Sequence, residues 1–170
     1  MTRYVALLRA VNVGGTSKLP MSELKAMCID AGFLRVETYI ASGNVVLDSK
    51  AKPSAVKLAI EARLLAYFGK PAAVVVRTSE EMAAVLEANP FPEAEPKHIY
   101  AIFLDEPPQR DALARVTGQT VERMALGSRE IFVYYGAGMV RSKLRIPAAK
   151  SGTARNMNTV AKLAEISSKA

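Results

Sequence analysis

The segment from Arg9 to Met21 gathers two adjacent glycines, two hydroxyls, an amide and two cations. Gly14 and Gly15 permit positive φ angles, which allow successive backbone N–H groups to point at one ligand atom. Lys18 and Arg9 add positive charge, and a helix beginning after the segment would add the positive end of its dipole. This combination suits a phosphate or a carboxylate. The alternative is a glycine turn that only connects a strand to a helix.

The glycine spacing in this segment matches neither of two nucleotide-binding fingerprints. G-x-G-x-x-G, for dinucleotides, and G-x-x-x-x-G-K-[ST], for nucleoside triphosphates, are both absent there. The segment therefore indicates an anionic ligand without naming it, and no cofactor is expected.

Two further polar motifs lie far from this segment in the chain. Ser42-Gly-Asn44 has the composition of a hairpin turn. Arg155-Asn156 stands at the predicted start of the last helix. The candidate ligand-binding residues are Arg9, Asn12, Gly14, Gly15, Lys18, Ser42, Asn44, Arg155 and Asn156.

The positive charge is concentrated near the C-terminus. The net charge is +7, and residues 137–170 contain seven Lys or Arg but only one acid. Such an excess attracts anions or nucleic acid. A solvated basic helix is the alternative interpretation. The aromatic run Phe132–Tyr135 lacks the Lys/Arg-Gly-Phe/Tyr frame of RNA-recognition modules, which weakens the case for base stacking.

Metal and nucleophile chemistry find little support. His98 is the only histidine and Cys28 the only cysteine, so no zinc or iron ligand set is expected and no Cys–His pair is indicated. A lone cysteine excludes an internal disulfide and fits the cytoplasm. No signal peptide is expected, and no apolar run reaches the 18 residues of a membrane span.

The elements predicted for the first half follow the order strand, helix, strand, strand, helix, strand. Apolar runs and helical spacing place them at 3–9, 20–31, 35–40, 44–48, 53–68 and 72–76. Thr78-x-x-Glu81 predicts a capping box that starts a third helix. This order is the split βαβ pattern of a ferredoxin-like plait.

The second half begins in the same way after the proline-rich stretch 89–97. Strands are expected at 99–104, 121–126 and 130–135, short helices at 111–116 and 142–146, and a final helix at 155–167. The expected fold is therefore α+β, with two tandem ferredoxin-like (α-β plait) subdomains at 1–90 and 91–170. Their sheets would be mainly antiparallel with helices on one face, and the second would end in the basic helix.

Four motifs in order resemble the domain-of-unknown-function family 1697. They are Leu7–Gly15 (LLRAVNVGG), Leu19–Leu24 (LPMSEL), Thr38–Val46 (TYIASGNVV) and Thr153–Leu163 (TARNMNTVAKL). Met157 stands where the family commonly has an aromatic residue. The resemblance implies two tandem plaits and no particular activity. It also favours one convergent site for these polar motifs, with a buried polar network between the halves as the alternative.

Three functional hypotheses follow. The first is binding of an anionic partner, either a nucleic acid or a phosphorylated metabolite, by the Gly14-Gly15 loop and the C-terminal basic segment. The second is a small metal-free enzyme acting on an anionic substrate. The third is a structural or partner-binding protein without a small ligand, and an oligomer formed through sheet edges is compatible with any of the three.

Overall fold

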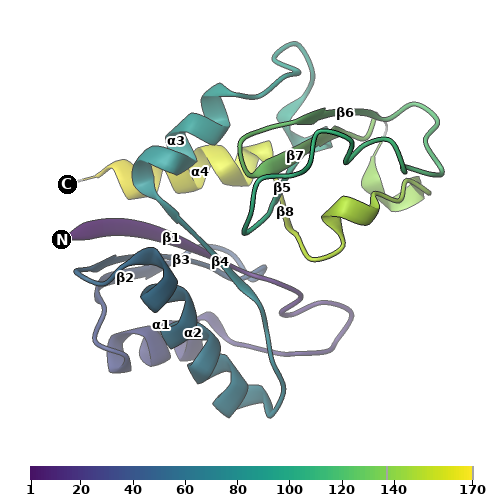
Figure 1. Cartoon of the computed structure of the whole chain (residues 1–170). Coiled ribbons are helices and arrows are strands. Elements are labelled where there is room, and N and C mark those ends of the chain that lie inside the picture. The colour runs from purple at the N-terminus through teal and green to yellow at the C-terminus, as the bar shows by residue number, and fades with distance from the viewer. Residues whose placement is uncertain (137, 170) are drawn as a thin grey trace. The chain divides into compact units, whose positions relative to one another are not determined.

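The computed structural model describes residues 1–136 and 138–169, which contain four α-helices and two antiparallel sheets of four strands each (Figure 1). The fold class is α+β, as the sequence predicts. The chain divides into two compact units, Met1–Met82 with Leu163–Ala170, and Ala83–Lys162. No helix in the described part of the chain has both the length and the apolar character needed to cross a membrane.

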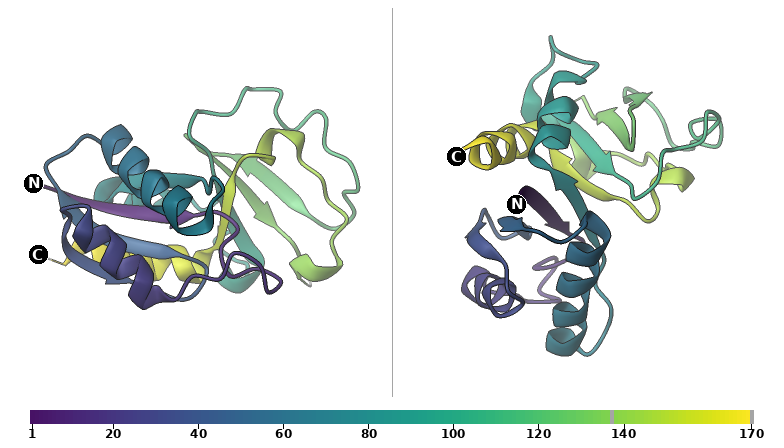
Figure 2. Two further views of the ribbon diagram at one scale, coloured as in Figure 1. Left: turned by 90° about the horizontal axis from the view of Figure 1, so that it is seen from below. Right: turned by 60° about the vertical axis from the view of Figure 1, so that its left-hand side comes forward.

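The first unit contains a sheet with the strand order β2-β3-β1-β4. All its neighbouring strands run antiparallel, and both α1 and α2 lie on the same side of the sheet (Figures 1 and 2). The element order is the predicted one, and its members are β1 (Thr2–Leu8), α1 (Met21–Asp30), β2 (Leu34–Thr38), β3 (Asn44–Ser49), α2 (Pro53–Phe68) and β4 (Val74–Thr78).

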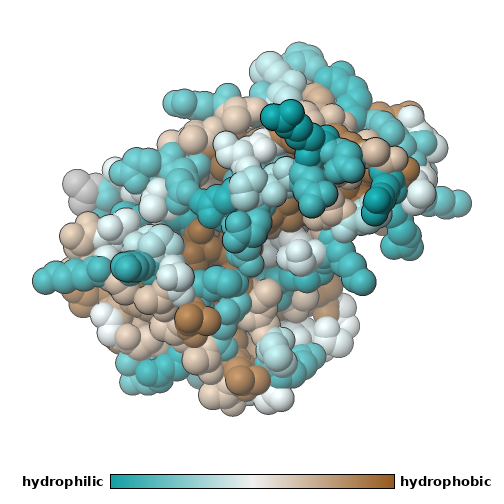
Figure 3. Space-filling model, viewed as in Figure 1, coloured by the Kyte–Doolittle hydropathy of each residue, from teal (hydrophilic) through white to brown (hydrophobic). Residues whose placement is uncertain are grey.

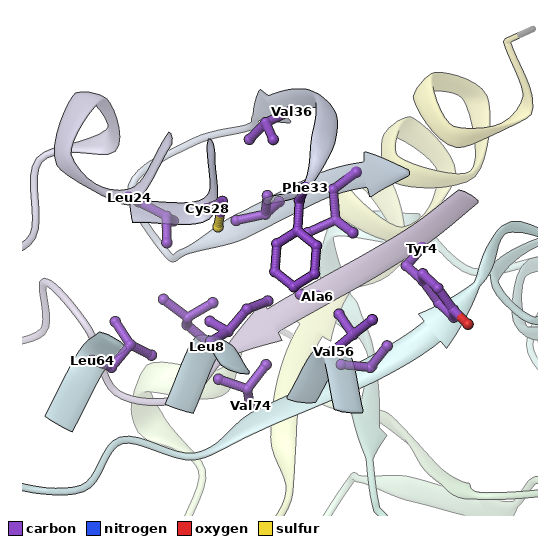
Figure 4. Packing of buried hydrophobic residues seen from close by; sticks show 14 of the residues in the cluster. Tyr4, Ala6, Leu8, Leu24, Cys28, Phe33, Val36, Val56, Leu64 and Val74 are labelled. Carbon is purple, nitrogen blue, oxygen red and sulfur yellow. The ribbon is translucent and has the colours of Figure 1, made fainter. Parts of the chain in front are cut away.

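The core of this unit forms because strand and helix periodicities agree. Every second residue of β1 points at the helices. These residues pack in one cluster with buried residues of α2 that are four positions apart, Val56, Ile60 and Leu64. Figure 4 shows Leu24 and Cys28 of α1 in the same cluster. Each fully buried aliphatic side chain contributes roughly 1.5–3 kcal/mol. The interpretation of Cys28 as a core residue is confirmed.

The second sheet has the strand order β6-β7-β5-β8, again with antiparallel neighbours. Helices α3 and α4 each contribute residues to both units. The remaining elements are α3 (Ser79–Glu87), η1 (Pro96–His98), β5 (Ile99–Phe103), β6 (Arg123–Leu126), β7 (Glu130–Tyr134), η2 (Met139–Arg141), η3 (Pro147–Ala149), β8 (Thr153–Asn156) and α4 (Met157–Ser168).

The two short helices predicted for the second half are wrong. Residues 111–115 form turns, and residues 142–146 are not helical. Within the second segment Leu144 and Ile146 are the inward positions, and their spacing of two is the period of an extended chain. Thr117 and Arg145 pair through two backbone hydrogen bonds of 3.0 and 2.8 Å. Extended and turn structure therefore covers one face of this sheet in place of helices.

The last helix also begins later than predicted. The sequence places its start at Arg155, whereas residues 153–156 form β8, which pairs with β5, and the helix begins at Met157. Strand β8 was not predicted, because its sequence TARN has little apolar content.

Candidate functional site

The glycine segment forms a small hairpin between β1 and α1. Gly14 and Gly15 have φ angles of +57° and +75°, the positive values that a type I′ turn requires at both central positions. The backbone N–H of Thr16 donates to the carbonyl of Val13 at 2.9 Å, and the N–H of Asn12 donates to the carbonyl of Ser17 at 3.0 Å. The glycines are therefore needed for the turn itself.

Asn12 holds this hairpin against the neighbouring β2–β3 turn. Its side-chain Nδ2 donates to the carbonyls of Leu19 and Ala41, both at 2.8 Å, and its Oδ1 accepts the N–H of Leu19 at 2.7 Å. These bonds use both donors and an acceptor lone pair of the amide. Asn12 thus shapes the loop, and its amide N–H groups are not available to a ligand.

Asn44 and Ser42 have a similar structural role in the β2–β3 turn. The side chain of Asn44 is 0% exposed, and its Nδ2 donates to the carbonyl of Tyr39 at 2.8 Å and to Ser42 Oγ at 2.9 Å. A buried amide satisfied in this way stabilises its turn, because leaving it unpaired would cost roughly 1–3 kcal/mol. Both residues stabilise the β2–β3 turn, of which Ala41 lines the hollow described next.

A hollow of about 440 Å³ lies beside the glycine hairpin. The residues that line it are Asn12, Gly15, Lys18, Leu19, Pro20, Met21 and Ala41. Lys18 is exposed. Helix α1 starts at this hollow, and its N-cap residue, Pro20, makes no side-chain capping bond. The positive end of the helix and a lysine ammonium therefore face the same space, which favours an anion.

The other two glycine-segment candidates are placed differently. Arg9 is exposed and its backbone N–H donates to the carbonyl of Ala73 at 3.0 Å, but it does not line the hollow. Gly14 occupies the hairpin tip next to Gly15 and does not line the hollow either. The structure thus brings Gly15, Lys18 and the start of α1 together, with Asn12 bonded to Leu19 and Ala41, whereas Ser42 and Asn44 stabilise the β2–β3 turn.

Arg155 and Asn156 belong to the second unit. Arg155 is only 8% exposed, and burial lowers the pKa of its guanidinium from 12.5 to about 10. Its Nη1 donates to the carbonyl of Ala154 at 2.9 Å. Asn156 is the N-cap of α4, since its Oδ1 accepts the N–H of Thr159 at 2.9 Å. One site shared by these two residues and the glycine hairpin stays a prediction.

Sequence reasoning missed a carboxylate network in the second unit. The carboxylate of Glu122 accepts hydrogen bonds from Ser142 Oγ and, at 2.7 Å, from the N–H of Thr120. The Ser142 and Thr120 bonds lower the pKa of Glu122 from 4.5 to about 2. Glu122 and Ser142 are twenty positions apart, so no local motif signals this pair.

Sequence reasoning also missed a second hollow, of about 490 Å³, in the same unit. It is lined by Leu104, Asp105, Glu106, Pro107, Pro108, Gln109, Asp111, Ala112, Arg115, Pro147, Ala148 and Ser151. Three carboxylates against one guanidinium make this lining unsuited to the anion that the sequence predicts. Prolines and acids in a loop carry no periodic signal that would reveal such a hollow.

Metal and thiol chemistry remain without a structural basis in the described residues. No group of three or more His, Cys, Asp or Glu side chains there could hold a metal ion. Burial raises the pKa of the Cys28 thiol to about 12, which keeps it protonated and unreactive. His98 is the last residue of η1, directly before β5, and its Nε2 is 3.9 Å from Glu95 Oε2.

The fold and the motifs define an α+β protein of two four-stranded antiparallel sheets. The chain belongs to the family described as protein of unknown function (DUF1697), which it matches over residues 1–132. Its structure is similar to that of the conserved bacterial protein SP0830 from Streptococcus pneumoniae, with a TM-score of 0.80, 24% sequence identity and coverage of 98% of each chain. That likeness shows the fold alone. No curated protein matches the chain.

Proposed function

We propose that the protein binds a small anionic ligand, such as a phosphorylated metabolite, in the hollow beside the glycine hairpin. One observation carries this proposal: the side-chain-uncapped start of α1 and the exposed Lys18 line the same hollow of about 440 Å³. Backbone N–H groups at a helix start, together with an ammonium, are a common way to hold a phosphate.

The lining supports binding more than catalysis. Among the described residues that line the hollow there is no carboxylate, imidazole or thiol, so no side chain there has the chemistry of a general base at neutral pH. The hydrogen bonds of Asn12 and Asn44 assign these side chains to the support of the loop. In the proposed site, therefore, Gly15, Lys18 and the first turn of α1 make the ligand contacts. We place this activity in the cytoplasm, which fits a single unpaired cysteine.

The test is an NMR titration of the full-length chain with inorganic phosphate, pyrophosphate and adenosine monophosphate. We expect backbone amide shifts confined to Gly15 and the first turn of α1. Lys18→Ala should raise the Kd at least about tenfold, the loss of one charge-assisted hydrogen bond. Lys25→Ala is the matched control, because Lys25 is exposed on the adjoining helix α1 and does not line the hollow.

Two results would overturn the proposal. One is the absence of shifts at the hairpin and the α1 start with all three probes. The other is an equal loss of affinity in Lys18→Ala and Lys25→Ala, which would mean that only the overall charge of the protein matters.

A further inference from the structure

A row of three cations projects from the second unit. Residues 141–147 alternate between exposed and half-buried positions, and the exposed ones include Arg141, Lys143 and Arg145. The residues between them turn inward, where Leu144 and Ile146 contact the hydrophobic cluster on the sheet. A period of two puts Lys143 and Arg145 on the same side of this extended stretch, and Arg141 precedes them as the last residue of η2. We call Arg141, Lys143 and Arg145 the basic row.

The backbone beneath the basic row is fixed at both ends. Arg145 pairs with Thr117 through two backbone hydrogen bonds, and Ser142 Oγ donates to the carboxylate of Glu122. The N–H of Leu144 also donates to Ser142 Oγ at 3.2 Å. A backbone held in this way loses little further conformational freedom when its side chains meet a partner, which favours binding.

In the part of the sequence that contains the basic row, the acidic side chains are buried and most of the basic side chains are exposed. Residues 118–152 contain six Lys or Arg and two acids, Glu122 and Glu130. Both acids are buried, at 4% and 5% exposure, whereas five of the six cations are exposed: Arg123, Arg141, Lys143, Arg145 and Lys150. No acid in the described residues forms an ion pair with a member of the basic row. Residues 141–145 therefore present three exposed cations and contain no acid.

The spacing of the row indicates which anion it fits. In extended chain, side chains two residues apart are separated by about 6.6 Å, so Lys143 and Arg145, with Arg141 before them, can face successive phosphates of an extended strand. A single small anion would engage one or two of them, and a membrane surface requires no linear order. Figure 3 shows that hydrophilic residues cover much of the surface over β6 and β7 on the face seen there.

We propose that the basic row binds the sugar–phosphate backbone of single-stranded nucleic acid, without selecting particular bases. This site differs from the hollow beside the glycine hairpin in its unit, its residues and its ligand. Base selection is not expected, because such contacts recognise the backbone and supply charge, not sequence.

The test measures the anisotropy of fluorescent oligothymidylate and oligouridylate on titration with the full-length chain. Binding should weaken with salt, and three phosphate contacts on a single strand predict a slope of log K against log salt of about −2. The triple variant Arg141→Gln, Lys143→Gln, Arg145→Gln should lose at least about tenfold in affinity at low salt and most of that slope. Its side chains are exposed, so the fold should be retained.

The matched control removes the same charge from the first unit. Lys25→Gln, Lys50→Gln, Lys70→Gln also replaces three exposed lysines and should leave affinity and slope near the wild-type values. Equal losses in the two triple variants would overturn the proposal, as would the absence of binding at low salt. So would row-dependent binding to phosphatidylglycerol vesicles without binding to either oligonucleotide, because Val140, 98% exposed beside the row, could then serve a membrane. Lys18→Ala should bind the oligonucleotides normally, so this proposal and that for the hollow fail separately.

Discussion

The two sheets have the same strand order but differ in the segments that connect their strands. In each sheet the second, third, first and fourth strands along the chain lie side by side in that sequence, with antiparallel neighbours. In the first unit α1 and α2 make the two crossovers. In the second unit the corresponding segments, 104–122 and 135–152, contain turns and short 3₁₀ helices.

The crossovers differ because their sequences do. The first unit offers apolar residues at helical spacing, as in Val56, Ile60 and Leu64. In the second unit, Pro107 and Pro108 precede a segment that has too few apolar residues at helical spacing to pack as a helix. Strand order is thus compatible with either kind of connection. It is set by the pairing of the strands.

The two kinds of crossover also differ in which backbone and side-chain groups they leave exposed to a ligand. Helical crossovers satisfy their own backbone groups, and in the first unit a helix start is left to face the hollow. The irregular crossovers, residues 104–122 and 135–152, need side chains and each other to satisfy their hydrogen-bonding groups. The bond between Glu122 and Ser142 and the backbone pair of Thr117 and Arg145 show this. In extended stretches these crossovers place residues two positions apart on one side of the chain, whereas a helix lines up residues three or four positions apart.

The largest expected effect tests how much each kind of crossover stabilises its sheet. In the described chain, the cluster that α1 and α2 form with the first sheet contains sixteen buried residues, against four in the cluster against which the irregular crossovers pack. Ile60→Ala should therefore lower the free energy of unfolding by about 2–5 kcal/mol. Leu144→Ala, at a half-buried position, should cost about 1 kcal/mol. Urea unfolding measures both, and equal losses would mean that the irregular crossover is as important as the helix.

A pair of glycines gives the next effect in size. Gly69, after α2, and Gly118, in the irregular crossover, have φ angles of +72° and +73°. A Cβ at Gly69 would meet nothing within 4 Å, whereas one at Gly118 would lie 2.0 Å from the carbonyl oxygen of Lys143. Gly69→Ala should cost about 1–2 kcal/mol from its backbone conformation alone. Gly118→Ala should cost roughly a further 1–3 kcal/mol, because the two loops must separate.

The same free-energy measurements check the glycine pair. Because the φ angles match, the backbone term cancels in the difference between the two variants. If Gly118→Ala is no more destabilising than Gly69→Ala, residues 118 and 143 are not held together in solution. The basic row would then lose the support that its proposed function requires.

The sequence predicts the first unit well, because its signals are local. The capping box at the start of α3 is confirmed: Glu81 N–H donates to Thr78 Oγ1 at 3.1 Å, and Thr78 N–H donates to Glu81 Oε1 at 2.8 Å. Strand and helix periods likewise give the βαββαβ order. The hairpin nature of Ser42–Asn44 and the burial of Cys28 follow from the same kind of reasoning.

The wrong predictions concern segments whose structure is decided by contacts with residues distant in the sequence. Strand β8 is held by β5, and Leu144 and Ile146 became part of a predicted helix because a five-residue segment cannot distinguish periods of 2 and 3.6. For the candidate site, the glycine segment that the sequence indicates lies beside a hollow, and ligand binding there stays a prediction. The sequence could not show that the side-chain amide of Asn12 donates to the carbonyls of Leu19 and Ala41, because Ala41 lies 29 residues away.

The smallest expected effect is a pH dependence that belongs only to the irregular crossover. The pKa of Glu122 falls from 4.5 to about 2 on folding, first because Ser142 Oγ donates to it and then because of the Thr120 N–H. A lowered folded-state pKa means that the unfolded chain takes up the proton first, so this carboxylate stabilises the folded state above about pH 4.5. That stabilisation declines as the pH falls toward 2.

The measurement compares the Tm of wild type and Glu122→Gln between about pH 7 and pH 2. The wild type should be more stable at neutral pH, and the two curves should converge through the acidic range. Ser142→Ala should produce part of the same pH dependence, since it removes one of the donors that lower the pKa. A constant difference between wild type and Glu122→Gln at all pH values would show that the carboxylate acts by shape and not by charge. The irregular crossovers would then be held by the backbone hydrogen bonds between Thr117 and Arg145 and by side-chain packing. Packing would be the feature that they share with the helical crossovers.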